Sequence, residues 1–140
     1  MSHIADFLKS CPEGEDFDEL RRNTPGEDGF DASFVGVLHE AWHWDDALYF
    51  RMEAAVVRVG QGYRDRDMPR GLILWLFDTY QYVFGALCYH EMACDAFVID
   101  NLDTDACHDR AERVEAVFRA VIAGYPPPLH VLEPPNPLLN

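Results

Sequence analysis

The stretch Gly71–Tyr89, GLILWLFDTYQYVFGALCY, decides the fold because it is nineteen residues long and apolar on nearly every side. Its apolar residues are Leu72, Ile73, Leu74, Trp75, Leu76, Phe77, Tyr80, Val83, Phe84 and Leu87. Pro69 suits the first position of a helix. A membrane span would place Asp78 near its centre, at a cost of about 2.5–3.5 kcal/mol. We therefore predict a central helix buried among other helices, with no membrane partner.

Two further helices follow from the apolar pattern on either side. After Asp45, a plausible N-cap, apolar residues recur at helical spacing as far as the glycines at 60 and 62. A final helix follows a cap at Asp103 or Thr104 and ends at Gly124. Between these helices, residues 95–101 read as a short extended segment. The prediction is a mainly α, compact single-domain helical bundle.

We divide the chain into three regions by composition. Residues 1–33 form an acidic N-terminal helix and loop, residues 34–124 the helical core, and residues 125–140 a proline-rich tail. The tail carries six prolines and is expected to run extended over the surface or hang free.

The net charge of −14 limits the classes of partner. Nucleic acids and anionic membranes need a basic surface, so neither is expected to bind. The same charge attracts basic proteins and speeds encounter with them. The N-terminus lacks the pattern of a signal peptide and cysteine is sparse, so we expect a cytoplasmic protein with free thiols.

The string HEAWH, from His39 to His43, matches the H-E-x-x-H pattern of zinc peptidases. On one helix this spacing places two imidazoles on the same face, with a glutamate ready to activate a metal-bound water. The extended form of the pattern has a third histidine where this chain has Tyr49, which leaves Glu53 as the best remaining ligand. We favour a structural role for the motif and keep a small zinc hydrolase as the alternative.

A second metal candidate combines cysteine and histidine after the central stretch. Its members are Cys88, His90, Cys94 and Cys107. Their gaps depart from the paired C-x-x-C spacing typical of structural zinc, and a cysteine within an apolar helix behaves as a small hydrophobe. We therefore predict no metal and no cofactor.

The order of the motifs resembles the immunity protein 41 family of bacterial polymorphic toxin systems. The resemblance begins with Phe34-Val35-Gly36, His39-Glu40, Trp44-Asp45, Tyr49-Phe50 and Glu53. It continues with Pro69-Arg70, Phe77, Tyr80, His90, Asp95, Phe97, Ile99, Asn101 and Glu112-Arg113. It covers about residues 34–124. One departure is Gly71, where the family pattern leads us to expect an acidic residue.

The resemblance implies a non-catalytic bacterial protein that binds the C-terminal toxin domain of a cognate toxin and neutralises it during contact-dependent competition. It implies no small-molecule substrate. An acidic domain suits a basic toxin. A third alternative is an adaptor or chaperone that binds an effector without inhibiting it.

We predict the toxin-binding residues from the acidic runs and the scaffold from the opening motif. The candidate contact residues are Asp28, Asp31, Glu91, Asp95, Asp100, Asp103, Asp105 and Asp109. The residues given a structural role are His39, Glu40, Trp42, Trp44, Asp45, Tyr49 and Glu53.

Overall fold

A computed structural model describes residues 3–90 and 98–139, and these residues form six α-helices and two short 3-10 helices without a β-strand. In chain order the elements are α1 His3–Ser10, α2 Glu15–Arg22, η1 Phe30–Ala32, α3 Phe34–Ala41, α4 Asp46–Gln61, α5 Arg70–His90, α6 Thr104–Ala123 and η2 Leu129–Val131. The predicted mainly α, single-domain fold is confirmed.

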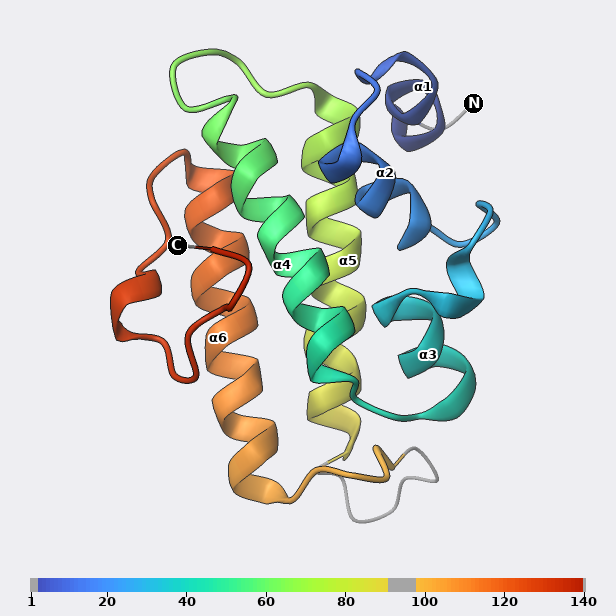
Figure 1. The fold of residues 1–140 in the computed structure, drawn as a ribbon, viewed down its shortest axis with the longest axis vertical. Helices are drawn as coiled ribbons and strands as arrows, with labels where there is room; N and C mark the ends of the chain where they lie inside the picture. Colours follow the sequence, from blue (N-terminus) through green and yellow to red (C-terminus); the bar gives the residue numbers. More distant parts are fainter. Residues whose placement is uncertain (1–2, 91–97, 140) are drawn as a thin grey trace.

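The three long helices α4, α5 and α6 run along the long axis of the molecule (Figure 1). Helix α6 packs against both α4 and α5, while α1 packs on α5 and α2 on α4. The N-terminal helices therefore cover one flank of the bundle, and the C-terminal tail lies over the opposite flank (Figure 1). The bulkiest fully buried side chains are Trp44, Trp75, Tyr49, Phe34 and Phe118.

The helix ends use the predicted residues. The Asp45 carboxylate accepts a hydrogen bond from the Leu48 amide (3.0 Å), and the Asp103 carboxylate accepts one from the Ala106 amide (2.8 Å). Each carboxylate satisfies one of the amides that the first turn leaves without an intrahelical partner. Gly124 ends α6 in the left-handed region at φ 85°, where glycine pays no steric cost. The caps at Asp45, Asp103 and Gly124 are confirmed.

Helix α5 is buried on one side and exposed on the other. Its inner face is formed by Leu72, Trp75, Leu76, Val83 and Leu87, all at most 2% exposed. On its outer face Ile73 is 38% exposed, Phe77 51% and Tyr89 53%. Helix α5 is long and apolar enough to cross a membrane, by length and composition alone. In the bundle, 44% of its most apolar stretch is buried. The predicted buried helix is confirmed, with its inner face in the core and part of its outer face exposed.

Gly71 allows α1 to cross the start of α5. A Cβ at this position would overlap the carbonyl oxygen of His3 and the Cβ of Phe7. Phe7 is itself buried, so it has little room to shift. An acidic side chain at position 71 therefore cannot fit while α1 occupies this place.

The predicted extended segment lies partly outside the described residues, because residues 95–97 are not among them. Residues 98–103 form neither helix nor strand and turn at Asp100 and Asn101. The Asn101 side chain accepts a hydrogen bond at Oδ1 from the Trp44 backbone amide (3.0 Å). Its Nδ2 donates one to the Trp44 carbonyl (2.8 Å). The Asp100 amide donates to the Trp42 carbonyl (2.9 Å). The α5–α6 connection is thus tied to the α3–α4 connection.

The described part of the proline-rich tail, residues 125–139, folds back on the bundle. Leu129, Leu132 and Leu139 pack against the core, and Asn136 is only 4% exposed. The Asn136 amide donates to the Phe50 carbonyl (3.0 Å) on α4. This buried amide, together with the packed leucines, holds a segment whose prolines disfavour an α-helix.

Candidate functional site

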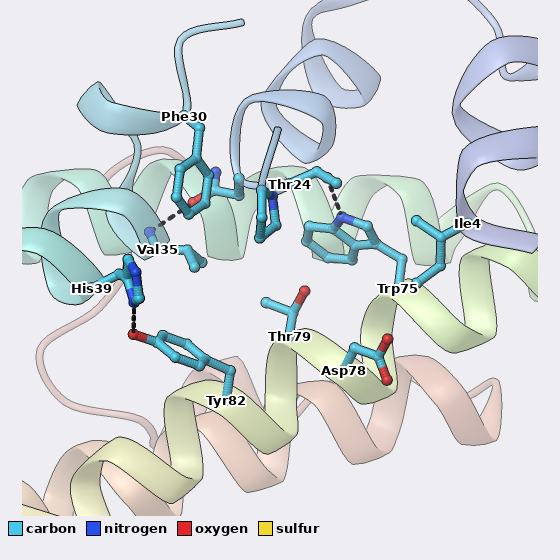
Figure 2. Close-up of a pocket in the computed structure, with 11 residues that line it drawn as sticks. Ile4, Thr24, Phe30, Val35, His39, Trp75, Asp78, Thr79 and Tyr82 are labelled. Atoms are coloured by element: carbon cyan, nitrogen blue, oxygen red, sulfur yellow. Dashed lines mark hydrogen bonds between the residues drawn. The ribbon is translucent and has the colours of Figure 1, made fainter. Parts of the chain in front are cut away.

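The HEAWH string does not form a two-histidine helical site, because α3 ends inside it. Trp42 caps α3 in the left-handed region at φ 51°, so His43 lies beyond the helix. His39 Nδ1 hydrogen-bonds with the Tyr82 hydroxyl (3.2 Å, Figure 2), whereas His43 Nδ1 pairs with Asp100 (2.7 Å). The two imidazoles face different partners, so the helical spacing behind the zinc interpretation is not formed.

The Cys and His candidates are likewise not assembled into a site among the described residues. Cys94 lies outside them, and His90 Nδ1 accepts a hydrogen bond from the Ile99 amide (2.9 Å). Cys88 is exposed and Cys107 is buried. No three His, Cys, Asp or Glu side chains in residues 3–90 and 98–139 lie close enough together to hold a metal ion.

The opening motif divides between core and surface. Trp44, Tyr49 and Glu53 are at most 2% exposed, and the Phe34 ring packs edge-on against Trp44 and Tyr49 with centroids 4.7 and 5.3 Å away. Asp45 caps α4, as described above. In contrast, His39 and Glu40 are exposed and Trp42 is half-buried.

Glu53 is the centre of a buried polar network that joins α4, α6 and the tail. Its carboxylate accepts hydrogen bonds from Arg113 Nε (2.7 Å) and Nη2 (2.9 Å), Asn136 Nδ2 (2.9 Å) and the Tyr49 hydroxyl (3.0 Å). Arg113 Nη1 donates to the Pro134 carbonyl (2.6 Å). Because each carboxylate oxygen has two donors, the buried charge is fully satisfied.

The network shifts the pKa values of two of its members. Burial, and then the negative charge of Glu53, raises the pKa of Tyr49 well above its ordinary value near 10. Burial lowers the pKa of Arg113, but the hydrogen bonds and charge of Glu53 outweigh it, so the net change is upward. At neutral pH Tyr49 therefore remains a donor and Arg113 a cation.

Tyr49→Phe is expected to lower the free energy of unfolding by about 1–2 kcal/mol at pH 8, since one hydrogen bond to a charged group is lost. Because folding raises the pKa of Tyr49, its neutral form stabilises the folded state fully below the unfolded pKa of about 10. This stabilisation is lost as the pH rises from that value toward the folded pKa. The deficit of Tyr49→Phe should therefore shrink by pH 11. Urea unfolding at both values measures this, with the exposed Tyr125→Phe as the control. A deficit that is the same at both pH values would contradict the assignment.

The structure separates the predicted acidic contact residues. Glu91 and Asp95 lie outside the described residues. Asp100 pairs with His43 and Asp103 caps α6, so both carboxylates make contacts within the fold. Asp105 and Asp109 are exposed on α6. Asp28 and Asp31 are exposed in the α2–α3 connection, away from the start of α6 (Figure 1). The described candidates therefore do not form one continuous patch.

Among residues 3–90 and 98–139, α5 carries an apolar surface that is largely open to solvent, although its apolar pattern predicted a place in the core. We define the α5 surface as Phe77, Tyr80, Phe84, Tyr89 and, from α6, Ile122. The rings of Tyr80 and Phe84 stack with centroids 5.3 Å apart. A hollow of about 800 Å³ lies between this surface and the end of α3, and one of about 290 Å³ lies between α5 and α6; Tyr80 lines both.

One signal could have revealed the α5 surface. Phe77, Tyr80 and Phe84 recur at i, i+3 and i+7, which is one helical face, and the aliphatic residues Leu72, Leu76, Val83 and Leu87 occupy another. Tyrosine suits a half-exposed position because its ring is apolar and its hydroxyl is polar. Burial, and then the charge of Glu115, raises the pKa of Tyr80, so its hydroxyl stays available as a donor.

Comparison with protein-family models, curated proteins and solved structures finds no match for this chain. The resemblance to the immunity protein 41 family therefore remains a prediction.

Proposed function

We propose that this chain is a non-catalytic bacterial protein that binds a basic domain of a partner protein and inhibits it, as an immunity protein does to its toxin. The observation that carries the proposal is the exposed aromatic α5 surface on a chain with a net charge of −14. Exposed apolar patches commonly mark binding surfaces, and aromatic side chains supply most hot spots.

Charge favours a basic partner over a second copy of this chain. Two copies at −14 repel each other at long range, whereas a basic protein is attracted. Charged side chains border the α5 surface. Glu115 and Arg119, paired at 3.8 Å, both line the hollow beside α6, and the charge of Glu40 adds to burial in raising the pKa of Tyr82. On a chain with a net charge of −14, an apolar surface fits an apolar patch edged by lysine or arginine.

Inhibition, as distinct from binding, is supported by the resemblance in motif order. An adaptor would share the same surface and charge, so the two functions differ in the fate of the bound partner. The proposed inhibitor is expected to restore growth when it is co-expressed with the toxin encoded beside it. Binding without restored growth would replace inhibition by the adaptor function, and no binding would overturn both.

The acidic start of α6 is expected to speed association with that toxin. Asp105→Lys with Asp109→Lys should reduce the association rate by about three- to tenfold at low salt, with a smaller effect at high salt. Asp103 is left unchanged because its substitution would remove the cap of α6. Stopped-flow measurement against Asp65→Lys with Asp67→Lys, which alters charge equally at the other end of the bundle (Figure 1), isolates the effect of position. Equal rates for the two variants would exclude the α6 run from the encounter.

A further inference from the structure

A cavity of about 330 Å³ opens between α1, the α2–α3 connection, α3 and α5 (Figure 2). Its walls are mainly apolar and include Ile4, Phe30, Val35, Trp75 and Tyr82. His39 and Tyr82 also line the hollow beside the α5 surface, so the two concave regions adjoin at this pair. A partner bound on the α5 surface can therefore reach the cavity.

Hydrogen bonds hold the cavity walls in place. Trp75 Nε1 donates to the Thr24 hydroxyl (2.8 Å), the Val35 amide donates to Asn23 Oδ1 (3.0 Å), and His39 pairs with Tyr82 (3.2 Å). Asn23 is in turn held by Glu19, whose carboxylate accepts from Asn23 Nδ2 (3.1 Å). The cavity is thus built from ordered side chains on separate elements, as preformed binding pockets are.

Two polar groups of the lining are not used by the walls. The Thr79 hydroxyl points into the cavity between Tyr82 and Trp75 (Figure 2). Asp78 is exposed beside Trp75 and Ile4, and within residues 3–90 and 98–139 its carboxylate has neither a hydrogen bond nor an ion pair. The site therefore combines an apolar interior, the three aromatic rings of Phe30, Trp75 and Tyr82, a hydroxyl and a carboxylate without a counter-charge.

We infer that this cavity receives a lysine or arginine side chain of the protein partner. The aliphatic stem of such a side chain covers apolar walls while its charged end reaches a carboxylate. Aromatic rings add cation–π attraction. An anionic group would be repelled by Asp78 and by the net charge of −14. The volume lies at the low end of the range for ligand pockets, which suits one side chain. This inference rests on the proposed function, since it names how the basic partner is recognised.

The test uses a single side chain as the probe and requires no toxin. Amide and indole NMR signals of the full chain are followed during titration with Nα-acetyl-lysine methylamide, whose side-chain ammonium is free. We expect saturable shifts at the Trp75 indole and at Thr79 and Tyr82, with a dissociation constant in the millimolar range, as befits so small a ligand. N-acetyl-norleucine methylamide has the same aliphatic stem without the charge and should bind at least fivefold more weakly.

Asp78→Asn should weaken lysine binding about fivefold and leave norleucine binding unchanged, whereas the control Asp67→Asn should alter neither. Equal affinities for lysine and norleucine, or shifts confined to residues outside the cavity, would overturn the inference. Binding of butylammonium without binding of the lysine amide would also overturn it, because the site would then take free amines. A toxin that binds the chain while the lysine probe does not would leave the proposed function standing and remove only the subsite.

Discussion

Replacing Arg113 with Met is expected to lower the free energy of unfolding by about 3–5 kcal/mol, because Glu53 would remain buried without its cationic partner. Glu53 is 0% exposed and receives two of its hydrogen bonds from Arg113. Methionine retains much of the aliphatic volume beside Phe50, so the change reports mainly the lost charge pair. Chemical denaturation at neutral pH measures it.

Two further variants separate this effect from a general loss at α6. Arg119→Met removes an exposed arginine from the same helix, whose side chain is 73% exposed, and should change stability by at most about 0.5 kcal/mol. Glu53→Gln combined with Arg113→Met removes both charges and should recover part of the loss, since the remaining amide still accepts from Tyr49. Equal losses for Arg113→Met and Arg119→Met would contradict the buried network.

The sequence predicted the helices whose two faces differ in polarity. In the sequence α4 and α6 each have an apolar stripe, so periodicity located them and the caps at Asp45, Asp103 and Gly124 fixed their ends, although the structure buries all of residues 52–57 of α4. Helix α5 has apolar residues on most sides. The sequence pattern of such a helix is the same whether a given face packs in the core or lies exposed at a binding surface. The positions of α1, α6, α3 and the α2–α3 connection, all of which contact α5, decide which face of α5 stays exposed.

Contacts between residues far apart in the chain could not be predicted from spacing. Glu53 and Arg113 each occupy a polar position on an amphipathic helix, where the usual interpretation is solvent exposure. Their pairing depends on the packing of α4 against α6, and the third element, Asn136, lies in a segment expected to be loosely held. The HEAWH string matches the zinc pattern in the sequence alone. Helix α3 ends at Ala41, and its C-cap Trp42 is a bulky residue that seldom adopts the left-handed conformation.

Phe77→Ser combined with Tyr89→Ser is expected to weaken binding of the toxin by more than about a hundredfold. Removal of an aromatic hot spot commonly costs 2 kcal/mol or more, and each 1.4 kcal/mol is a factor of ten. The two positions are twelve steps apart in the sequence, or about 18 Å along the helix, so they test both hollows beside α5. Calorimetry or surface plasmon resonance with the co-expressed toxin measures the loss.

The fold should tolerate this change, because Phe77 and Tyr89 are 51% and 53% exposed and already contact water. Tyr125→Ser combined with Val131→Ser is the matched control, since these side chains are 48% and 63% exposed and lie beyond the end of α6 and in the tail. If both double variants bind the toxin as tightly as the unaltered chain, the α5 surface is not the interface. If the α5 variant alone loses binding while its unfolding curve is unchanged, the exposed aromatic side chains provide contacts with the partner that stability of the bundle does not need.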